Sequence, residues 1–505
     1  MRFMLRKWMM TTLLASALVR GQQPITFDTV RLNTVNSYLI GYSVFDNANG
    51  PIVFALGGDG TGSYQTLRTS RFSGSGEHLD ENEFVDSRLV WPGSFAPVTS
   101  NVEGGYACGL SKYGNGNPIS QLYLYLFDNA GDTLSTHLLM EDTTVAVRKC
   151  IQTSNGDYVL VGLHEQPKGA FMFRTTAEGD SILFVNFGEP SFIALSVTED
   201  SDQNLFLAGY AENADPNFNQ NCYIIKCTPE GEVLWWRSRP RISVFTQVFT
   251  TQDNGVLAIG AYGLGAGGLG ESMAFVVKYN SEGDELWAQD IIAADNATRP
   301  CGLTDGFENP DGSYMVCGQV RNFTLGLNDK GMLHKLDAEG NVLWSRYYAH
   351  YADMPLGNDQ IFNDVEPSND GGFILTGETN GPAPPNSHRL WLLKLDSVGC
   401  LVPGCNTVGV EEFESELQSA LQISPNPASE QVTVDLALPE GYQLEGTVQL
   451  MLLDVQGKEV LRRTIRASVA QLRTNVDLSA YPSGLYYVHL RDDRKWLAGG
   501  KVLVE

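Results

Sequence analysis

The sequence has few basic residues: 34 Lys and Arg stand against 59 Asp and Glu, which gives a formal net charge of -25. A surface this acidic repels phosphate backbones and anionic membranes, so the composition argues against nucleic acid as a partner. Beyond the N-terminal segment, no run approaches the roughly 18 apolar residues that a membrane-spanning helix needs. We therefore predict a mature chain without a transmembrane span.

The sequence also lacks the common signatures of catalysis and metal binding. Its seven histidines form no HExxH or HxH motif, its eight cysteines form no CxxC pair, and no GxSxG or DxDxDG segment occurs. A formal GxGxxG at Gly263, Gly265 and Gly268 precedes the strand-like AFVVKYN rather than a helix, so we interpret it as a loop and not a phosphate site. We predict no cofactor and no metal, and these absences favour binding or scaffolding over catalysis.

The first 21 residues resemble a secretory signal peptide. Arg2, Arg6 and Lys7 form a basic region, and a short apolar run follows from Trp8 to Val19. We expect removal of residues 1–21, a mature chain that starts near Gln22, and a secreted or cell-surface location on the exterior of the outer membrane.

A turn motif recurs seven times between residues 71 and 399. In each copy a Ser, Asp, Asn or Thr precedes a Gly by three residues, as in RFSGSG, LFDNAG, RTTAEG, KCTPEG, KYNSEG, KLDAEG and KLDSVG. The side chain of the first residue can bond the backbone just ahead, and Gly supplies the positive φ that closes the turn. The motif predicts seven hairpin turns.

A second signal precedes each turn. Apolar segments such as YVLVG, LFLAG and FILTG end in a glycine, and these seven glycines lie between 47 and 59 residues apart, at positions 57, 109, 162, 209, 260, 318 and 377. Seven units of about 50 residues, each with four short strands, predict an all-β fold with a seven-bladed β-propeller at residues 22–405. A solenoid is the alternative, but its repeats are usually shorter.

Two features concern the ends of this array. The last unit runs out of strand after KLDSVGC, while the segment 25–33 precedes the first unit without a blade of its own, so we expect it to complete the seventh blade. Cys400 and Cys405 are close enough in sequence to form a disulfide there. Residues 406–422 are acidic and lack the repeat, which predicts a linker.

The remaining residues, 423–505, alternate apolar and polar positions around Gly and Pro turns, which predicts a small β-sandwich. Four motifs follow in order: SPNPA, LLDVQGKEV, LSAYPSGLYYVHL and the final GKVLVE. Together they resemble the type A C-terminal sorting domain of proteins exported by the type IX secretion system of Bacteroidetes bacteria. The resemblance implies an exported protein that engages this machinery through Pro425, Asn426, Pro427, Gly457, Gly484 and Lys501. The body of the chain resembles uncharacterised seven-repeat propellers joined to such domains.

Long loops on one face of the propeller are where ligand binding is expected. Within them the densest group of aromatic and titratable side chains predicts a ligand site that consists of Tyr347, Tyr348, His350, Tyr351 and Asp353. Aromatic faces beside a carboxylate suit a carbohydrate ring or a peptide side chain of a surface protein. The alternative is that some of these tyrosines pack between blades.

The sequence favours an exported binding or scaffold module. Two alternatives stay open: a glycan-active hydrolase or lyase with acids on the long-loop face, and a structural subunit of a surface assembly. No catalytic residue can be named from the sequence.

Overall fold

The computed structural model describes most of the chain between residues 26 and 505. The described residues are 26–31, 38–58, 65–84, 89–90, 98–114, 117–188, 192–215, 218–239, 243–265, 268–291, 301–320, 329–351, 360–380, 388–401, 417, 420–438, 447–454, 458–465, 471–491 and 496–505. All regular elements in these ranges are β-strands, which confirms the all-β prediction. The predicted signal peptide and all but Leu417 and the last three residues of the predicted linker lie outside these ranges.

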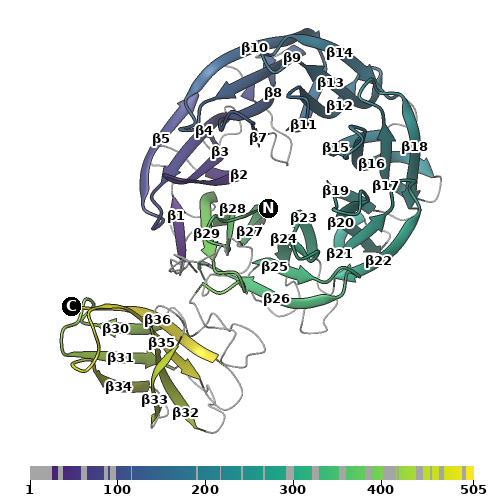
Figure 1. The fold of residues 1–505 in the computed structure, drawn as a ribbon. Helices are drawn as coiled ribbons and strands as arrows, with labels where there is room; N and C mark the ends of the chain where they lie inside the picture. Colours follow the sequence, from purple (N-terminus) through teal and green to yellow (C-terminus); the bar gives the residue numbers. More distant parts are fainter. Residues whose placement is uncertain are drawn as a thin grey trace, which may run out of the picture.

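Antiparallel sheets follow one another around a central opening (Figure 1). An eight-stranded sheet contains β1 (Phe27–Arg31), β2 (Tyr38–Asn47), β3 (Gly50–Gly58), β4 (Gln65–Phe72), β5 (His78–Phe84), β27 (Gln360–Pro367), β28 (Phe373–Asn380) and β29 (His388–Leu395). The next sheet contains β6 (Leu89–Val90), β7 (Val98–Ser100), β8 (Tyr106–Gly114), β9 (Asn117–Phe127) and β10 (Thr133–Thr143). We call the group β2 to β5 the first sheet and this one the second.

Four four-stranded sheets complete the ring. The third contains β11 (Val145–Gln152), β12 (Tyr158–Glu165), β13 (Lys168–Thr175) and β14 (Ser181–Asn186), and the fourth contains β15 (Phe192–Glu199), β16 (Leu205–Asp215), β17 (Phe218–Cys227) and β18 (Val233–Arg239). The fifth contains β19 (Ser243–Thr250), β20 (Val256–Gly265), β21 (Gly268–Tyr279) and β22 (Glu285–Ile291), and the sixth contains β23 (Cys301–Glu308), β24 (Tyr314–Val320), β25 (Lys330–Leu336) and β26 (Val342–Tyr348). The group β27, β28, β29 and β1 is the seventh sheet.

The N-terminal strand β1 lies at the outer edge of the seventh sheet. It pairs antiparallel with β29 from Phe27 opposite Lys394 to Arg31 opposite Leu390. The seventh sheet therefore combines strands from both ends of the propeller sequence, as Figure 1 shows. The arrangement closes the ring through backbone hydrogen bonds, and it makes the fold a β-propeller.

The recurring strand glycines mark a close approach of backbones. In five sheets a Cβ on this glycine would collide with a carbonyl oxygen of the innermost strand, as Gly318 would with Gly302 and Gly377 would with Ile361. The innermost strand carries a β-bulge beside the glycine, for example between Leu303 and Asp305. Such bulges re-aim the side chains next to them. In these five sheets the second strand therefore requires glycine at the point where the innermost strand bulges toward it.

The recurring turns are held as the sequence predicts. The Asp337 side chain accepts hydrogen bonds from the backbone N–H groups of Glu339 and Asn341, at 3.1 and 2.7 Å, and Gly340 has a φ of 82°. Trp287, on the outermost strand of the fifth sheet, packs against Gly340 of the sixth. These turns thus leave room for the aromatic side chain that fills the space between adjacent sheets.

The C-terminal strands form two sheets packed around a common core. One has the order β30 (Leu421–Ser424), β31 (Gln431–Ala437), β34 (Gln471–Asp477), and the other has the order β33 (Glu459–Ile465), β32 (Val448–Leu453), β35 (Gly484–Arg491), β36 (Trp496–Val504). Asn426 joins the first sorting motif to the last, because its Nδ2 donates to the Lys501 carbonyl at 2.8 Å and its Oδ1 accepts from the Leu503 N–H at 2.9 Å. The Lys501 ammonium donates to the Thr26 carbonyl at 2.5 Å, so this domain contacts the residue just before β1.

Candidate functional site: a cavity in the central channel

In six of the seven sheets the innermost strand places one side chain directly after a β-bulge. We call these residues the channel ring: Ser43, Lys149, Ser196, Gln247, Asp305 and Asp364. Strands β2, β11, β15, β19, β23 and β27, which carry them, surround the central opening in Figure 1. The bulge recurs, but the chemistry of the following side chain changes from sheet to sheet.

A cavity of about 150 Å³ lies among these strands. Five channel ring residues line it, together with the next inward residues on the same strands and parts of β7. The lining includes Ser43, Phe45, Lys149, Asp305, Phe307 and Glu366. The cavity thus combines carboxyl, ammonium, hydroxyl and aromatic groups.

Two carboxyl groups of the channel ring also bind neighbouring sheets. Asp364 accepts the N–H of Val44 at 2.7 Å, and Asp305 accepts the N–H of Val365 at 3.1 Å. The Gln247 amide donates to the other Asp305 oxygen at 2.7 Å. Both aspartates are buried. These bonds fix the carboxyl groups in place before any ligand arrives.

The acidic side of the cavity holds protons more tightly than exposed carboxyl groups do. Burial, and then the charge of Asp305, raises the pKa of Glu366 to about 8, while Lys149 opposes the shift. Burial and Asp305 also raise the pKa of Asp364 well above its ordinary value. Near neutral pH the site therefore carries fewer negative charges than its three carboxyl groups suggest.

Ser43 provides a polar atom without a partner. The residue is 2% exposed, and its Oγ has no hydrogen-bond partner within the described part of the chain. A buried hydroxyl left unsatisfied costs roughly 1–3 kcal/mol. A ligand in the cavity would supply the missing partner.

The residues predicted as a ligand site lie elsewhere, where the sixth sheet meets the seventh and β1. Tyr348 is buried and its hydroxyl donates to the Gly399 carbonyl at 2.7 Å, while Tyr347 packs edge-on against His334. His350 shares a 2.8 Å hydrogen bond with Asp28, which also accepts from Trp391.

Tyr351 accepts a hydrogen bond from Arg389 at 2.7 Å. Asp353 lies outside the described residues. The described members therefore contribute to packing and to closure of the ring, and ligand binding by this group stays a prediction.

Two other residues proposed from the sequence, Cys405 and Gly457, lie outside the described ranges. Cys400 is disulfide-bonded, but Cys405, its predicted partner, is not described. Gly457 of the second sorting motif is likewise not described. Pro425, Pro427 and Gly484 lie in the C-terminal domain, the last at the start of β35.

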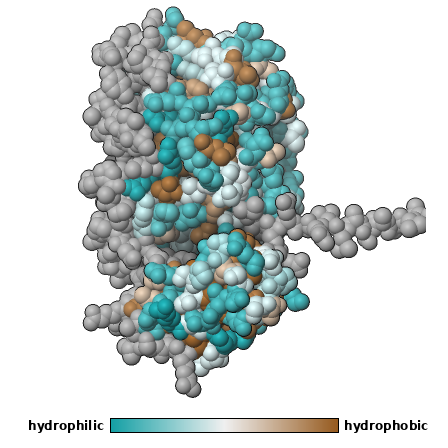
Figure 2. Space-filling view, turned by 90° about the vertical axis from the view of Figure 1, so that its left-hand side faces the viewer, coloured by the Kyte–Doolittle hydropathy of each residue, from teal (hydrophilic) through white to brown (hydrophobic). Residues whose placement is uncertain are grey.

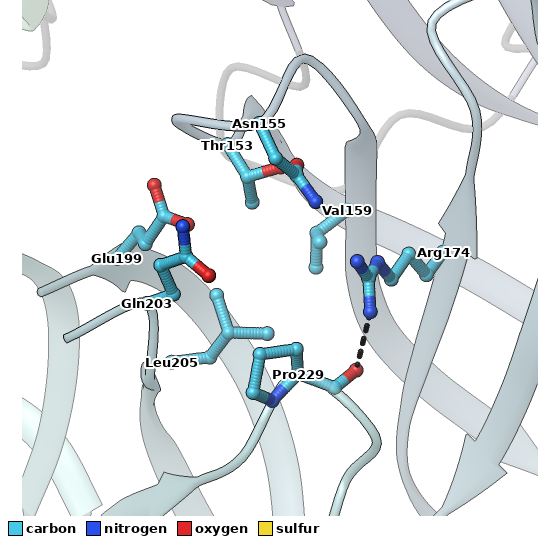
Figure 3. Close-up of a pocket in the computed structure, with 8 residues that line it drawn as sticks. All are labelled: Thr153, Asn155, Val159, Arg174, Glu199, Gln203, Leu205 and Pro229. Atoms are coloured by element: carbon cyan, nitrogen blue, oxygen red, sulfur yellow. Dashed lines mark hydrogen bonds between the residues drawn. The ribbon is translucent and has the colours of Figure 1, made fainter.

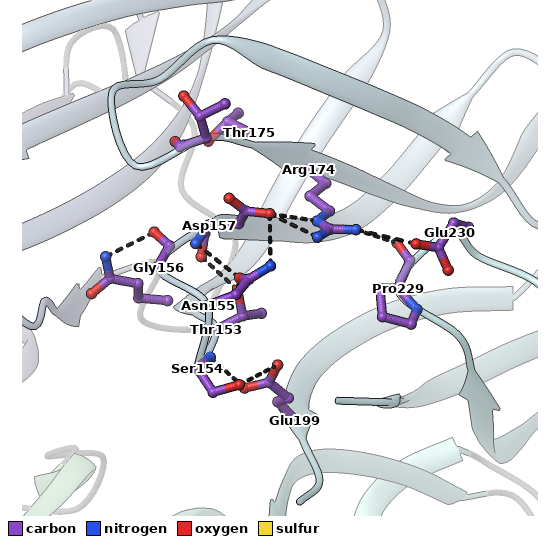
Figure 4. A network of polar contacts seen from close by, with 12 residues as sticks. Thr153, Ser154, Asn155, Gly156, Asp157, Arg174, Thr175, Glu199, Pro229 and Glu230 are labelled. Carbon is purple, nitrogen blue, oxygen red and sulfur yellow. Dashed lines mark hydrogen bonds and ion pairs between the residues drawn. The ribbon is translucent and has the colours of Figure 1, made fainter. Parts of the chain in front are cut away.

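A second pocket, between the third and fourth sheets, is too small to hold more than about one water molecule. Its volume is about 10 Å³, and Arg174 closes one side by reaching the Pro229 carbonyl at 3.5 Å (Figure 3). Figure 4 shows the surrounding contacts: Arg174 pairs with Asp157 at 2.8 Å, and the Ser154 N–H donates to Glu199 at 2.6 Å. The bonds to Pro229 and Glu199 join adjacent blades, so we assign this pocket a structural role.

A signal for the channel site was present in the sequence but was not used. The innermost strands contain GYSVF, VRKCI, ALSVT, FTQVF, LTDGF and FNDVE, whose third residue precedes the strand glycine by 13 residues in five units and by 14 in the first. Their shared polar position is the channel ring. It could have been found by comparing the repeats with one another.

Two negative findings apply to the described ranges only. No helix there is long and apolar enough to cross a membrane. Those ranges contain no group of three or more His, Cys, Asp or Glu side chains arranged to hold a metal ion.

The large hydrophobic side chains exposed on outer strands include Leu234 and Trp236 on β18. On the face shown in Figure 2, hydrophobic side chains lie in small groups separated by hydrophilic ones. The described residues on that face do not offer the continuous apolar patch expected of a subunit in a surface assembly.

Similarity to solved structures is confined to the fold. The chain is 14% identical to a protein of unknown function from Bacteroides caccae, with a TM-score of 0.35, 55% of this chain and 87% of that chain covered. It is 10% identical to the β-propeller domain of the Trilobed protease from Pyrococcus furiosus, with a TM-score of 0.37 and coverage of 74% and 94%.

A third solved structure, a Synechocystis apocarotenoid oxygenase mutant, is 12% identical, with a TM-score of 0.38 and coverage of 67% and 96%. A comparison with curated proteins finds no match. At these levels of identity and structural similarity, none of the three solved proteins assigns an activity to this chain.

The C-terminal match is the informative one. Residues 422–505 match the family described as Secretion system C-terminal sorting domain. These residues contain both sheets of the C-terminal sandwich and the Asn426 contacts to β36. The chain is therefore an exported β-propeller protein that carries a secretion system C-terminal sorting domain at residues 422–505.

Proposed function

We propose that this protein binds a small polar ligand in the central channel of its propeller after export through its C-terminal sorting domain. The proposal keeps the binding role expected from the sequence. It moves the expected site from the long-loop cluster to the channel cavity.

One observation carries the proposal: the channel ring varies in chemistry while the positions that hold the fold together repeat. In five sheets the same repeat position carries a Lys or Arg that pairs with an Asp of the turn between the first two strands. In three of these sheets the Asp position repeats as well, as in Lys278 with Asp253 and Lys335 with Asp311. The channel ring instead presents Ser43, Lys149, Gln247 and Asp305 to one cavity. Packing alone requires similar side chains at equivalent positions, whereas a ligand is recognised by different groups at each.

The proposal is tested by a screen of small polar metabolites against the purified protein, with thermal stabilisation as the readout. Ligand at one hundred times its Kd stabilises a protein by about 2.7 kcal/mol, which a melting curve detects. The same screen is repeated with Ser100→Trp, because Ser100 lines the cavity but is exposed, so a large ring there fills the cavity without disturbing the core. Ser75→Trp, on an exposed turn, is the matched control.

We expect stabilisation of the parent chain and of the Ser75→Trp control, with a loss in Ser100→Trp. Stabilisation that survives in Ser100→Trp would place the site outside the channel and overturn the proposal. Conversion of the bound compound during the assay would assign the cavity a catalytic function instead.

A further inference from the structure

The lining of the channel cavity has acidic and basic groups on different sheets. Asp305 on β23, and Asp364 and Glu366 on β27, bring three carboxyl groups to one part of the wall. Lys149 on β11 brings an ammonium group to the cavity from the third sheet, on the far side of the opening in Figure 1. Among the described residues Lys149 forms no direct ion pair with these acids, but its charge opposes the rise in the pKa of Asp364 and Glu366.

Apolar and aromatic side chains contribute a smaller part of the mostly polar wall. Phe45 and Phe307 line the cavity with Val98 and Ile151. The Phe45 ring is held by Tyr106, with ring centroids 4.7 Å apart, and by Phe54 at 6.1 Å. A short aliphatic or aromatic group of a ligand would contact these rings.

The volume restricts the size of the ligand. A space of about 150 Å³ has room for on the order of ten water molecules, and hence for a ligand of roughly ten non-hydrogen atoms. The orphan Ser43 hydroxyl is an independent sign that a polar ligand belongs here, since it is buried in the wall without a partner among the described residues.

We infer, building on the proposed function, that the cavity takes a small zwitterion of the size of a free amino acid. Its ammonium group points to the carboxyl groups of the sixth and seventh sheets, and its carboxylate points to Lys149. The Ser43 hydroxyl donates to the ligand carboxylate, and the side chain of the ligand packs against Phe45 and Phe307. A zwitterion satisfies both sides of the cavity, whereas a simple cation leaves Lys149 uncompensated and a simple anion faces the acids.

The test compares three probes that differ only in their charged groups. L-leucine carries both charges, 3-methylbutylamine only the ammonium, and 4-methylpentanoate only the carboxylate. Isothermal titration calorimetry with the purified protein is expected to show leucine binding at least about tenfold more tightly than either analogue, a difference of about 1.4 kcal/mol. Glucose serves as a neutral polar probe.

Two variants distinguish recognition from general damage to the fold. Lys149→Met is expected to weaken leucine by about tenfold and to leave 3-methylbutylamine unchanged, because only the carboxylate contact is lost. Ser43→Ala removes the hydroxyl and should weaken leucine by about threefold. Lys335→Met, whose ion pair lies away from the cavity, is the matched control and should bind leucine like the parent chain.

The outcomes separate this inference from the proposed function. Equal affinity for leucine and 3-methylbutylamine, or an unchanged leucine affinity in Lys149→Met, overturns the zwitterion assignment. Binding of glucose but not leucine overturns it too, while the channel remains a ligand site. If none of the four probes binds, the zwitterion assignment falls, and the wider metabolite screen decides whether the proposed function falls with it.

Discussion

Two ion pairs that join a repeated lysine to a turn aspartate differ in burial. Lys226 and Asp200 in the fourth sheet are 2.8 Å apart, with side chains 7% and 0% exposed. Lys335 and Asp311 in the sixth sheet are 3.1 Å apart, with side chains 21% and 61% exposed. The two lysines hold equivalent repeat positions, but Asp200 is the first residue of its turn and Asp311 is the third. The different turn position places one pair in the protein interior and the other at its surface.

We predict that Lys226→Met lowers the free energy of unfolding by about 3 kcal/mol, because it leaves the Asp200 carboxylate buried and uncompensated. Lys335→Met should cost less than about 1 kcal/mol, since water and counterions screen an exposed pair. Urea denaturation of both variants beside the parent chain measures the difference. Similar losses in the two variants would contradict the role assigned to burial.

At the level of the strand, the bulge and the glycine beside it form one structural unit. The channel ring residues project from the innermost strand at a bulge. At this bulge a carbonyl of the innermost strand comes so close to the second strand that a Cβ there would collide with it. The sixth sheet offers a direct comparison, because Gly318 on β24 lies opposite Leu303, and Gly302 is the residue before Leu303 on β23. No heavy atom lies within 4 Å of a Cβ built on Gly302.

Gly318→Ala is expected to destabilise the protein by about 1–3 kcal/mol, because its methyl group collides with the Gly302 carbonyl. Gly302→Ala should be neutral or stabilising by about 0.5 kcal/mol, since alanine restricts the unfolded chain and has space in the folded one. Melting curves of the two variants provide the measurement. A stable Gly318→Ala variant would show that the bulge does not depend on this glycine.

For the molecule as a whole, the buried acids of the channel couple stability to pH. The folded chain keeps the Glu366 proton up to a pKa of about 8, whereas an unfolded chain releases it near the ordinary value of 4.5. This contribution is therefore fully present below pH 4.5 and is lost as the pH rises through 8. Asp364, whose pKa is also raised, acts in the same direction, and Asp305 and Lys149 are the charged groups that face Glu366.

We predict that stability falls by up to about 2 kcal/mol between pH 6 and pH 9, as the Glu366 carboxyl ionises beside Asp305. Glu366→Gln should flatten this decline, because the amide does not titrate. Glu339→Gln, at an exposed turn, should leave the decline unchanged. A parallel decline in Glu366→Gln would assign the pH dependence to other groups.

We expect export of the whole chain to depend on its C-terminal domain. Deletion of residues 422–505 is expected to retain the propeller inside the outer membrane, because these residues form the sorting domain. Fractionation of the producing cells with an antibody to the propeller measures the location. A truncated chain that still appears outside the cell would show that another segment directs export.

The sequence by itself determined the all-β fold, the repeated turns and the sorting domain. These features depend on local rules: Asx or Thr side chains that bond the next backbone groups, glycines with positive φ, and strand motifs that lie close together along the chain. Asp337 and Gly340 show how directly such rules translate into structure.

Only the tertiary structure decided where the candidate site lies. Tyr348 looked like a loop residue suited to a ligand, but ring closure buries it and gives its hydroxyl a backbone partner. Ser43, Lys149 and Asp305 are far apart in the sequence, and they share a cavity because their three sheets turn the same strand position to the channel. No local pattern brings them together, because the meeting of strands from separate sheets depends on the closed ring.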